Sequence, residues 1–139
     1  MTPRRAAQTR RASLTDAGLY LAKAEEFMRA AEDSFELHNL IAAMGNAVHA
    51  GISAADAIAS ARGGSVWTGE HSQAAGHLER VAAADGRDAG RHLRRLLPLK
   101  SRAEYDPRPV TLSEASAAVE AARRTVAIAE RVVSSTRAE

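Results

Sequence analysis

Residues 38–61 read HNLIAAMGNAVHAGISAADAIASA, a stretch without proline that predicts one long helix. Its apolar residues recur at alternating spacings of three and four, which places them on one face of a helix with about 3.6 residues per turn. These residues are Leu40, Met44, Ala47, Gly51, Ala54, Ile58 and Ala61. A second apolar stripe runs beside the first and contains Ile41, Val48, Ile52, Ala55 and Ala59. More than half of the helix surface therefore needs partners, which indicates a helix at the centre of the fold.

One narrow polar ridge remains on this helix, formed at the same spacing by Asn46, His49, Ser53 and Asp56. An imidazole with possible donors and acceptors one turn away on either side resembles the start of an acid/base site. A row of short polar groups is also typical of a solvent-facing stripe or of an internal hydrogen-bond ladder. Both interpretations stay open at the level of sequence.

Length and composition favour a single, closely packed helical domain. The 139 residues suit one core, and they are 45% apolar but only 4% aromatic. The absence of cysteine excludes disulfides and thiolate metal sites, and it agrees with a reducing, cytoplasmic location. No stretch approaches the ~20 consecutive apolar residues of a membrane span, so we expect a soluble protein without membrane contact.

Further helices are expected on both sides of the central one. A first helix follows the possible caps Ser13, Thr15 and Asp16, and it breaks from the central helix between Ser34 and Asn39. After a glycine-rich loop at 62–69, a third helix is expected at about 70–84 and a fourth at 88–97, separated by Asp85-Gly86.

The last helix has the clearest start. Thr111-Leu112-Ser113-Glu114 matches a capping box, and the proline-containing segment before it, residues 99–110, predicts an extended connector. The sequence thus predicts an all-α protein, an up-and-down bundle of about five helices. We expect a flexible basic arm at 1–12, the bundle at 13–135 and a disordered tail at 136–139.

The most basic part of the predicted bundle runs from Asp85 to Arg108 and contains seven Lys and Arg residues but only four Asp and Glu residues. Clustered arginines suit contacts with phosphate groups, so this segment is a candidate for binding RNA or nucleotide. The candidate residues are Arg91, Arg94, Arg95, Lys100, Arg102 and Tyr105. An ordinary amphipathic helix, whose arginine stems cover apolar surface, explains the same pattern equally well.

Motifs for metal binding are absent from the sequence. It contains neither Glu-x-x-His, which di-iron bundles use, nor His-Glu-x-x-His. We therefore expect no metal site and no cofactor.

Several stretches together resemble the HEPN-domain family. These are SFELHNLIAAMGNAVHAGISAADAIASARGG, a following helix that contains histidine, LRRLLPLKSRAEYDP and a final alanine-rich helix, and the similarity covers about 17–133. Proteins of this family are small, all-α and commonly dimeric, and they are often encoded beside a minimal nucleotidyltransferase or within defence systems. The resemblance implies a homodimer that acts with a nucleotidyltransferase-type or other defence partner.

Many HEPN proteins are metal-independent ribonucleases with an Arg-x4-6-His motif, in which the arginine binds phosphate and the histidine acts on the 2′-hydroxyl. The arginine before the last helix resembles Arg102, but no histidine follows it at the required spacing. Arg87 and His92 do satisfy the spacing, earlier in the chain than the resemblance places it. These two are the candidate catalytic residues.

The preferred hypothesis is a non-catalytic binding or assembly component of a toxin–antitoxin or defence system that binds RNA or nucleotide. One alternative is an active endoribonuclease toxin that uses Arg87 and His92 across a dimer cleft. Another is a structural helical adaptor without a role in nucleic-acid binding.

Overall fold

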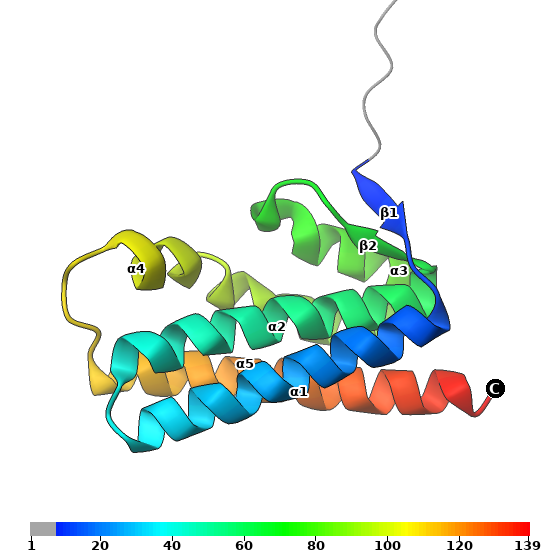
Figure 1. Ribbon diagram of the computed structural model, residues 1–139. Helices are drawn as coiled ribbons and strands as arrows, with labels where there is room; N and C mark the ends of the chain where they lie inside the picture. The colour runs from blue at the N-terminus through cyan, green and yellow to red at the C-terminus, as the bar shows by residue number, and fades with distance from the viewer. Residues whose placement is uncertain (1–7) are drawn as a thin grey trace, which may run out of the picture.

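Helices make up most of the protein, whose computed structural model describes residues 8–139 (Figure 1). This confirms the predicted all-α class. The helices are α1 (Leu14–Glu36), α2 (Leu40–Gly63), α3 (Ala74–Leu96), α4 (Leu99–Tyr105) and α5 (Leu112–Arg137). A single 3-10 turn at His71–Gln73 precedes α3, and two short strands, β1 (Thr9–Arg11) and β2 (Ser65–Trp67), form a small antiparallel sheet.

Helix α2 lies at the centre, as the two apolar stripes predict. It packs most extensively on α1 and α5 and also contacts α3 and α4. Its core residues Ala43, Ala47 and Ala54 are fully buried, and their small side chains let neighbouring helices approach closely. At Gly51 the approach is so close that an added Cβ would collide with Leu96.

Capping boxes start both α1 and α5. The Ser13 hydroxyl accepts a hydrogen bond from the Asp16 backbone N–H at 3.0 Å, and the Asp16 carboxylate accepts one from the Ser13 N–H at 2.8 Å. Thr111 and Glu114 make the same reciprocal pair at 3.1 and 3.0 Å. Each box satisfies amide groups that the first turn of a helix leaves free, so both helix starts follow from local sequence.

Helix α3 folds back on itself at Ala83, whose φ of 50° is a left-handed value unusual for alanine. The two arms of the resulting hairpin pack together, and Gly86 and Gly90 in the second arm lie against Leu78 and Ala75 in the first. The sequence correctly predicts two helical segments here, but the reversal lies at Ala83 and not at Asp85-Gly86.

The sheet lies where the sequence predicts an arm and a loop. Thr9 pairs with Trp67 and Arg11 with Ser65, and the Ala12 N–H donates to the Gly64 carbonyl at 2.9 Å. The predicted flexible arm at 1–12 is therefore wrong for residues 9–11, and its residues 1–7 lie outside the described part of the chain. Strand pairing between segments so far apart cannot be inferred from either segment alone.

Two other expectations at the C-terminal side are wrong. The connector at 99–110 contains α4, which Pro98 precedes at the N-cap position, where the missing N–H of proline is not needed. The predicted tail at 136–139 is not fully disordered, because α5 continues to Arg137.

Candidate phosphate-binding groove

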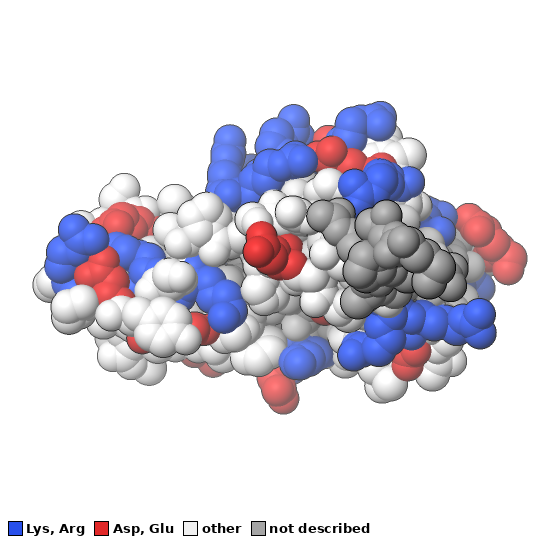
Figure 2. All heavy atoms as spheres, turned by 90° about the horizontal axis from the view of Figure 1, so that it is seen from above, with Lys and Arg blue, Asp and Glu red and all other residues white. Residues whose placement is uncertain are grey.

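The second arm of α3 carries an exposed row of arginines, as the sequence predicts. Figure 2 shows Lys and Arg side chains gathered along the edge of the molecule that lies behind α2 in Figure 1, with a few Asp and Glu side chains among them. Two of these arginines form ion pairs on the surface of α3, Arg91 with Asp88 at 3.2 Å and Arg94 with Glu79. Arg87 and Arg95 have no ion-pair partner among residues 8–139.

A groove of about 290 Å³ lies between this arm of α3 and the first half of α5. Polar and charged side chains line its rim, and alanines with one leucine form its floor. The lining residues are His92, Arg95, Leu99, Ala117, Ala118, Glu120, Ala121 and Arg124. The groove thus joins a predicted site residue on α3 to side chains of α5.

His92 is the distinctive group of the groove. Its Nδ1 is buried, and within residues 8–139 it has no hydrogen-bond partner. Buried polar atoms in folded proteins are usually hydrogen-bonded, so this nitrogen is an unsatisfied group in a side chain that lines the groove. Burial lowers the pKa of His92, and the nearby charges of Arg91, Arg95 and Arg124 lower it further, so the imidazole is neutral at physiological pH.

Glu120 sets the charge on the opposite wall. It accepts hydrogen bonds from Arg124 at 2.9 Å and from Arg123 at 2.6 Å, and these bonds lower its pKa. Arg124 is therefore partly neutralised by Glu120, whereas Arg95 has no ion-pair partner among residues 8–139. An anion that enters competes with Glu120 for Arg124 and meets Arg95 directly.

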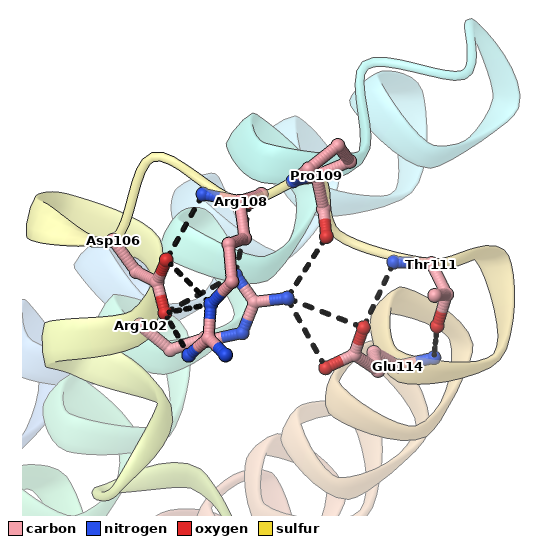
Figure 3. Close-up of polar contacts among 6 residues, drawn as sticks. All are labelled: Arg102, Asp106, Arg108, Pro109, Thr111 and Glu114. Carbon is pink, nitrogen blue, oxygen red and sulfur yellow. Dashed lines mark hydrogen bonds and ion pairs between the residues drawn. The ribbon is translucent and has the colours of Figure 1, made fainter.

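Arg102, a predicted RNA-binding residue, has a structural role instead (Figure 3). Its guanidinium donates to the backbone carbonyls of Arg108 at 3.0 Å and Pro109 at 2.9 Å, and it also lies 3.4 Å from the Glu114 carboxylate. Its side chain is only 18% exposed. Arg102 thus holds the α4–α5 connector against the start of α5, and little of it faces solvent.

The other predicted binding residues on α4 are not part of the groove. Lys100 pairs with Glu104 at 3.5 Å, one turn along α4. Tyr105 is 78% exposed at the end of this helix. Neither side chain lines the groove, although both lie on the surface.

Arg87 and His92, the candidate catalytic pair, do not converge within one chain. Five positions separate them on the same helical arm, which turns their side chains about 140° apart. His92 lines the groove and Arg87 does not. The paired arrangement that ribonuclease chemistry requires is therefore not formed by this chain alone.

The polar ridge of α2 is divided between two environments. At one end His49 stacks on Phe27 with ring centroids 5.2 Å apart, and its Nε2 lies 3.8 Å from Glu104. At the other end burial raises the pKa of Asp56 to about 7, although Arg10 and Lys23 act in the opposite direction. Among the described residues no hydrogen bond joins the side chains of Asn46, His49, Ser53 and Asp56, and the acid/base interpretation of this ridge stays a prediction.

Sequence reasoning missed the α5 wall of the groove. Glu120 and Arg124 have the spacing of an ordinary exposed ion pair one turn apart, and only the packing of α5 beside α3 brings them near His92.

Over residues 8–139, no group of three or more His, Cys, Asp and Glu residues is arranged to hold a metal ion. Within the same residues, no helix has both the length and the apolar character needed to cross a membrane.

Two comparisons with known sequences were informative only in finding no match. No protein-family model matches the sequence, and a search of curated proteins finds no match. The resemblance to HEPN domains therefore stays a prediction, and the function has to be argued from the groove itself.

Proposed function

We propose that the protein is a non-catalytic helical binding protein that holds a phosphate group of RNA or of a nucleotide in the groove between α3 and α5. The observation that supports this most directly is the groove that brings the imidazole of His92 together with the guanidinium groups of Arg95 and Arg124. A phosphate oxygen accepts hydrogen bonds from all three side chains once the imidazole is protonated.

The shape of the groove favours a small ligand with one anionic and one apolar part. A volume of about 290 Å³ is at the lower limit of small-molecule pockets, which suits a single nucleotide unit and not a folded RNA. The floor of Ala117, Ala118, Ala121 and Leu99 offers an apolar surface on which a base can lie. The exposed arginines of α3 then extend the contact along a longer strand.

The wider biological role follows from the family resemblance and belongs to the same proposal. A bundle of about five helices with a HEPN-like fold would act in the cytoplasm as a binding or assembly component of a toxin–antitoxin or defence system. Its partner would be a nucleotidyltransferase-type or other defence protein. The ribonuclease version would need Arg87 and His92 of two different copies to meet, because within one chain only His92 lines the groove.

Binding of AMP and of a short single-stranded RNA, measured at several salt concentrations, tests the groove. We expect Arg95→Ala to weaken binding by about tenfold, because a charged hydrogen bond in a partly buried site is lost. For AMP, Arg87→Ala is the matched control, since it removes the same charge from the same helical arm outside the groove. Equal losses of AMP affinity in the two variants would show that the arginines attract the phosphate without a specific groove.

The state of His92 gives a second test. Burial holds the pKa of free His92 below its ordinary value of 6.5, and bound phosphate stabilises the imidazolium and raises this pKa. Binding therefore takes up a proton, and the affinity increases as the pH falls. His92→Ala removes this pH dependence. Incubation of the same RNA without metal then separates binding from cleavage: intact RNA is expected, and cleavage that depends on both Arg87 and His92 would favour the ribonuclease.

A further inference from the structure

The seam between α1 and α5 is hollowed at two places. The two helices lie side by side and run in opposite directions (Figure 1). The first hollow has a volume of about 280 Å³ and the second a volume of about 440 Å³. Glu32 and Arg123 line both of them, so the hollows adjoin. We call the two hollows together the α1–α5 groove.

The lining of the two hollows repeats after seven residues. On α1, Met28 lines the first hollow and Phe35 lines the second. On α5, Val126 and Val119 do the same. Seven residues of a helix span about 10.5 Å, which is close to two turns. A further helix laid along the groove therefore presents its residues i and i+7 to the two hollows, as in the knobs-into-holes packing of coiled coils.

The α1–α5 groove has an apolar floor and is long enough for such a helix. Met28, Val119 and Val126 are buried in the floor, whereas Leu112 is 52% exposed at the end where α5 begins. Between Leu112 and Glu130, which lines the first hollow, α5 rises by about 27 Å, the length of five helical turns. The groove thus offers contacts to a helix of about 18 residues.

Unpaired carboxylates border the second hollow. Glu32 and Glu36 come from α1, and neither forms an ion pair with another residue in 8–139. Both lie near the C-terminal end of α1, where the helix dipole disfavours negative charge, and the last turn contains no basic residue. Arg123 does little to balance them, because its guanidinium pairs with Glu120 at 2.6 Å. The rim of this hollow therefore attracts cations.

Two more carboxylates border the first hollow. Glu25 comes from α1 and Glu130 from α5. Burial raises the pKa of Glu130, and the neighbouring Glu25 raises it further. Arg29 lies on the same rim, and among residues 8–139 it forms no ion pair. Carboxylates that raise each other's pKa are stabilised by a cation placed beside both of them.

We propose that the α1–α5 groove binds a basic amphipathic helix of another protein, with apolar side chains seven residues apart in the two hollows and Lys or Arg side chains against the carboxylates of the rim. The spacing of the hollows favours a helix over an extended strand, whose side chains on one face repeat every two residues. The unpaired carboxylates favour a basic helix over an acidic one. In this mode of recognition the apolar face of the helix lies in the groove.

The α1–α5 groove is separate from the phosphate-binding groove. The phosphate-binding groove uses Ala117, Ala121 and Arg124 of α5, whereas the α1–α5 groove uses Val119 and Val126. Binding of a helix and binding of phosphate can therefore be tested independently, and failure of either leaves the other unchanged.

Fluorescence anisotropy of a designed peptide with the whole chain tests the proposal. The probe is a labelled helical peptide of about 18 residues, with leucines at heptad spacing on one face and lysines beside them. We expect micromolar affinity that weakens as the salt concentration rises. The same peptide with glutamates in place of the lysines is expected to bind at least about tenfold more weakly.

Two variants locate the binding site. Ala127→Trp, at an exposed position of α5, fills the first hollow and is expected to weaken binding by about tenfold or more. Glu32→Lys, at the rim of both hollows, is expected to weaken binding of the lysine peptide and to strengthen binding of the glutamate peptide. Glu26→Lys is the matched control, because Glu26 is an exposed glutamate of α1 that lines neither hollow. Circular dichroism establishes that each variant is folded.

Failure of the wild type to bind the lysine peptide at concentrations up to about 100 µM would overturn the proposal. So would equal affinity for the two peptides, binding that Ala127→Trp preserves, or a loss in Glu26→Lys as large as that in Glu32→Lys. Sedimentation tests the other occupant of the groove: a wild-type dimer that Ala127→Trp dissociates would show that a second copy of this chain fills it, and would overturn the proposal as well.

Discussion

Replacement of Arg102 by alanine is predicted to destabilise the protein without affecting the phosphate-binding groove. The change removes two charge-assisted hydrogen bonds to the carbonyls of Arg108 and Pro109, at 3.0 and 2.9 Å. Such bonds contribute about 1.5–3 kcal/mol when buried, and the lower value applies here because both acceptors belong to exposed residues that water can reach. The ion pair with Glu114 adds less than about 1 kcal/mol.

The predicted loss in the free energy of unfolding is therefore about 3 kcal/mol, which lowers the melting temperature of a protein of this size by roughly 10 °C. Urea unfolding followed by circular dichroism measures it. Arg102→Lys is the informative companion, because one ammonium group does not reproduce the forked contact with two carbonyls and is expected to recover less than half of the loss. A loss below about 0.5 kcal/mol for the alanine variant would refute the structural role. Weakened AMP binding by a folded variant would restore Arg102 as a ligand-binding residue.

Three further predictions concern a titrating group, a close backbone contact and the groove. Folding raises the pKa of Asp56 from 3.8 to about 7, so the free energy of unfolding falls as the pH rises between these two values. Asp56→Asn should therefore raise the free energy of unfolding above pH 7, by at most about 4 kcal/mol. Urea unfolding at several pH values should show that this gain disappears below pH 3.8. Gly86→Ala should lower the free energy of unfolding in urea by about 1–3 kcal/mol, because the new methyl group collides with the Leu78 carbonyl across the α3 hairpin. Gly76→Ala is the control, because its methyl group meets only the end of the Arg80 side chain and should not lower the free energy of unfolding. Glu120→Gln should strengthen AMP binding severalfold in calorimetry, because Arg124 no longer has a charged competitor, and unchanged or weaker binding would contradict the assigned position of the phosphate.

The parts of the fold that sequence predicts are those set by neighbouring residues. The capping box at Thr111 was predicted because it needs only a hydroxyl and a carboxylate three positions apart, and Ser13 was one of three possible caps for the first helix. The position of α2 at the centre follows from its periodicity, because a helix with two apolar stripes has to be covered on two sides.

The parts that sequence does not predict depend on contacts between distant segments. The β1 strand, TRR, has no apolar alternation, and only its pairing with residues 65–67 makes it a strand. The turn at Ala83 has no glycine to mark it, since the nearby Gly86 serves close packing and not the reversal.

The candidate site shows the same division. Arg95 was predicted from clustered charge and His92 from its spacing to Arg87, and both line the groove. Arg102 belonged to the same cluster, but its hydrogen-bonding partners on the connector remove it from the site. Arg124 was missed because it lies far from His92 along the chain, and only the packing of α5 beside α3 places both residues in the same groove.

The order of the helices along the chain has a consequence for how the protein folds during translation. Helix α2 is translated before α5, which is one of the two helices that cover it most extensively. Until then the nascent chain presents an alanine-lined surface that water solvates poorly. Completion of the core is therefore expected to follow release of the C-terminal helix from the exit tunnel, and earlier intermediates are natural clients for chaperones.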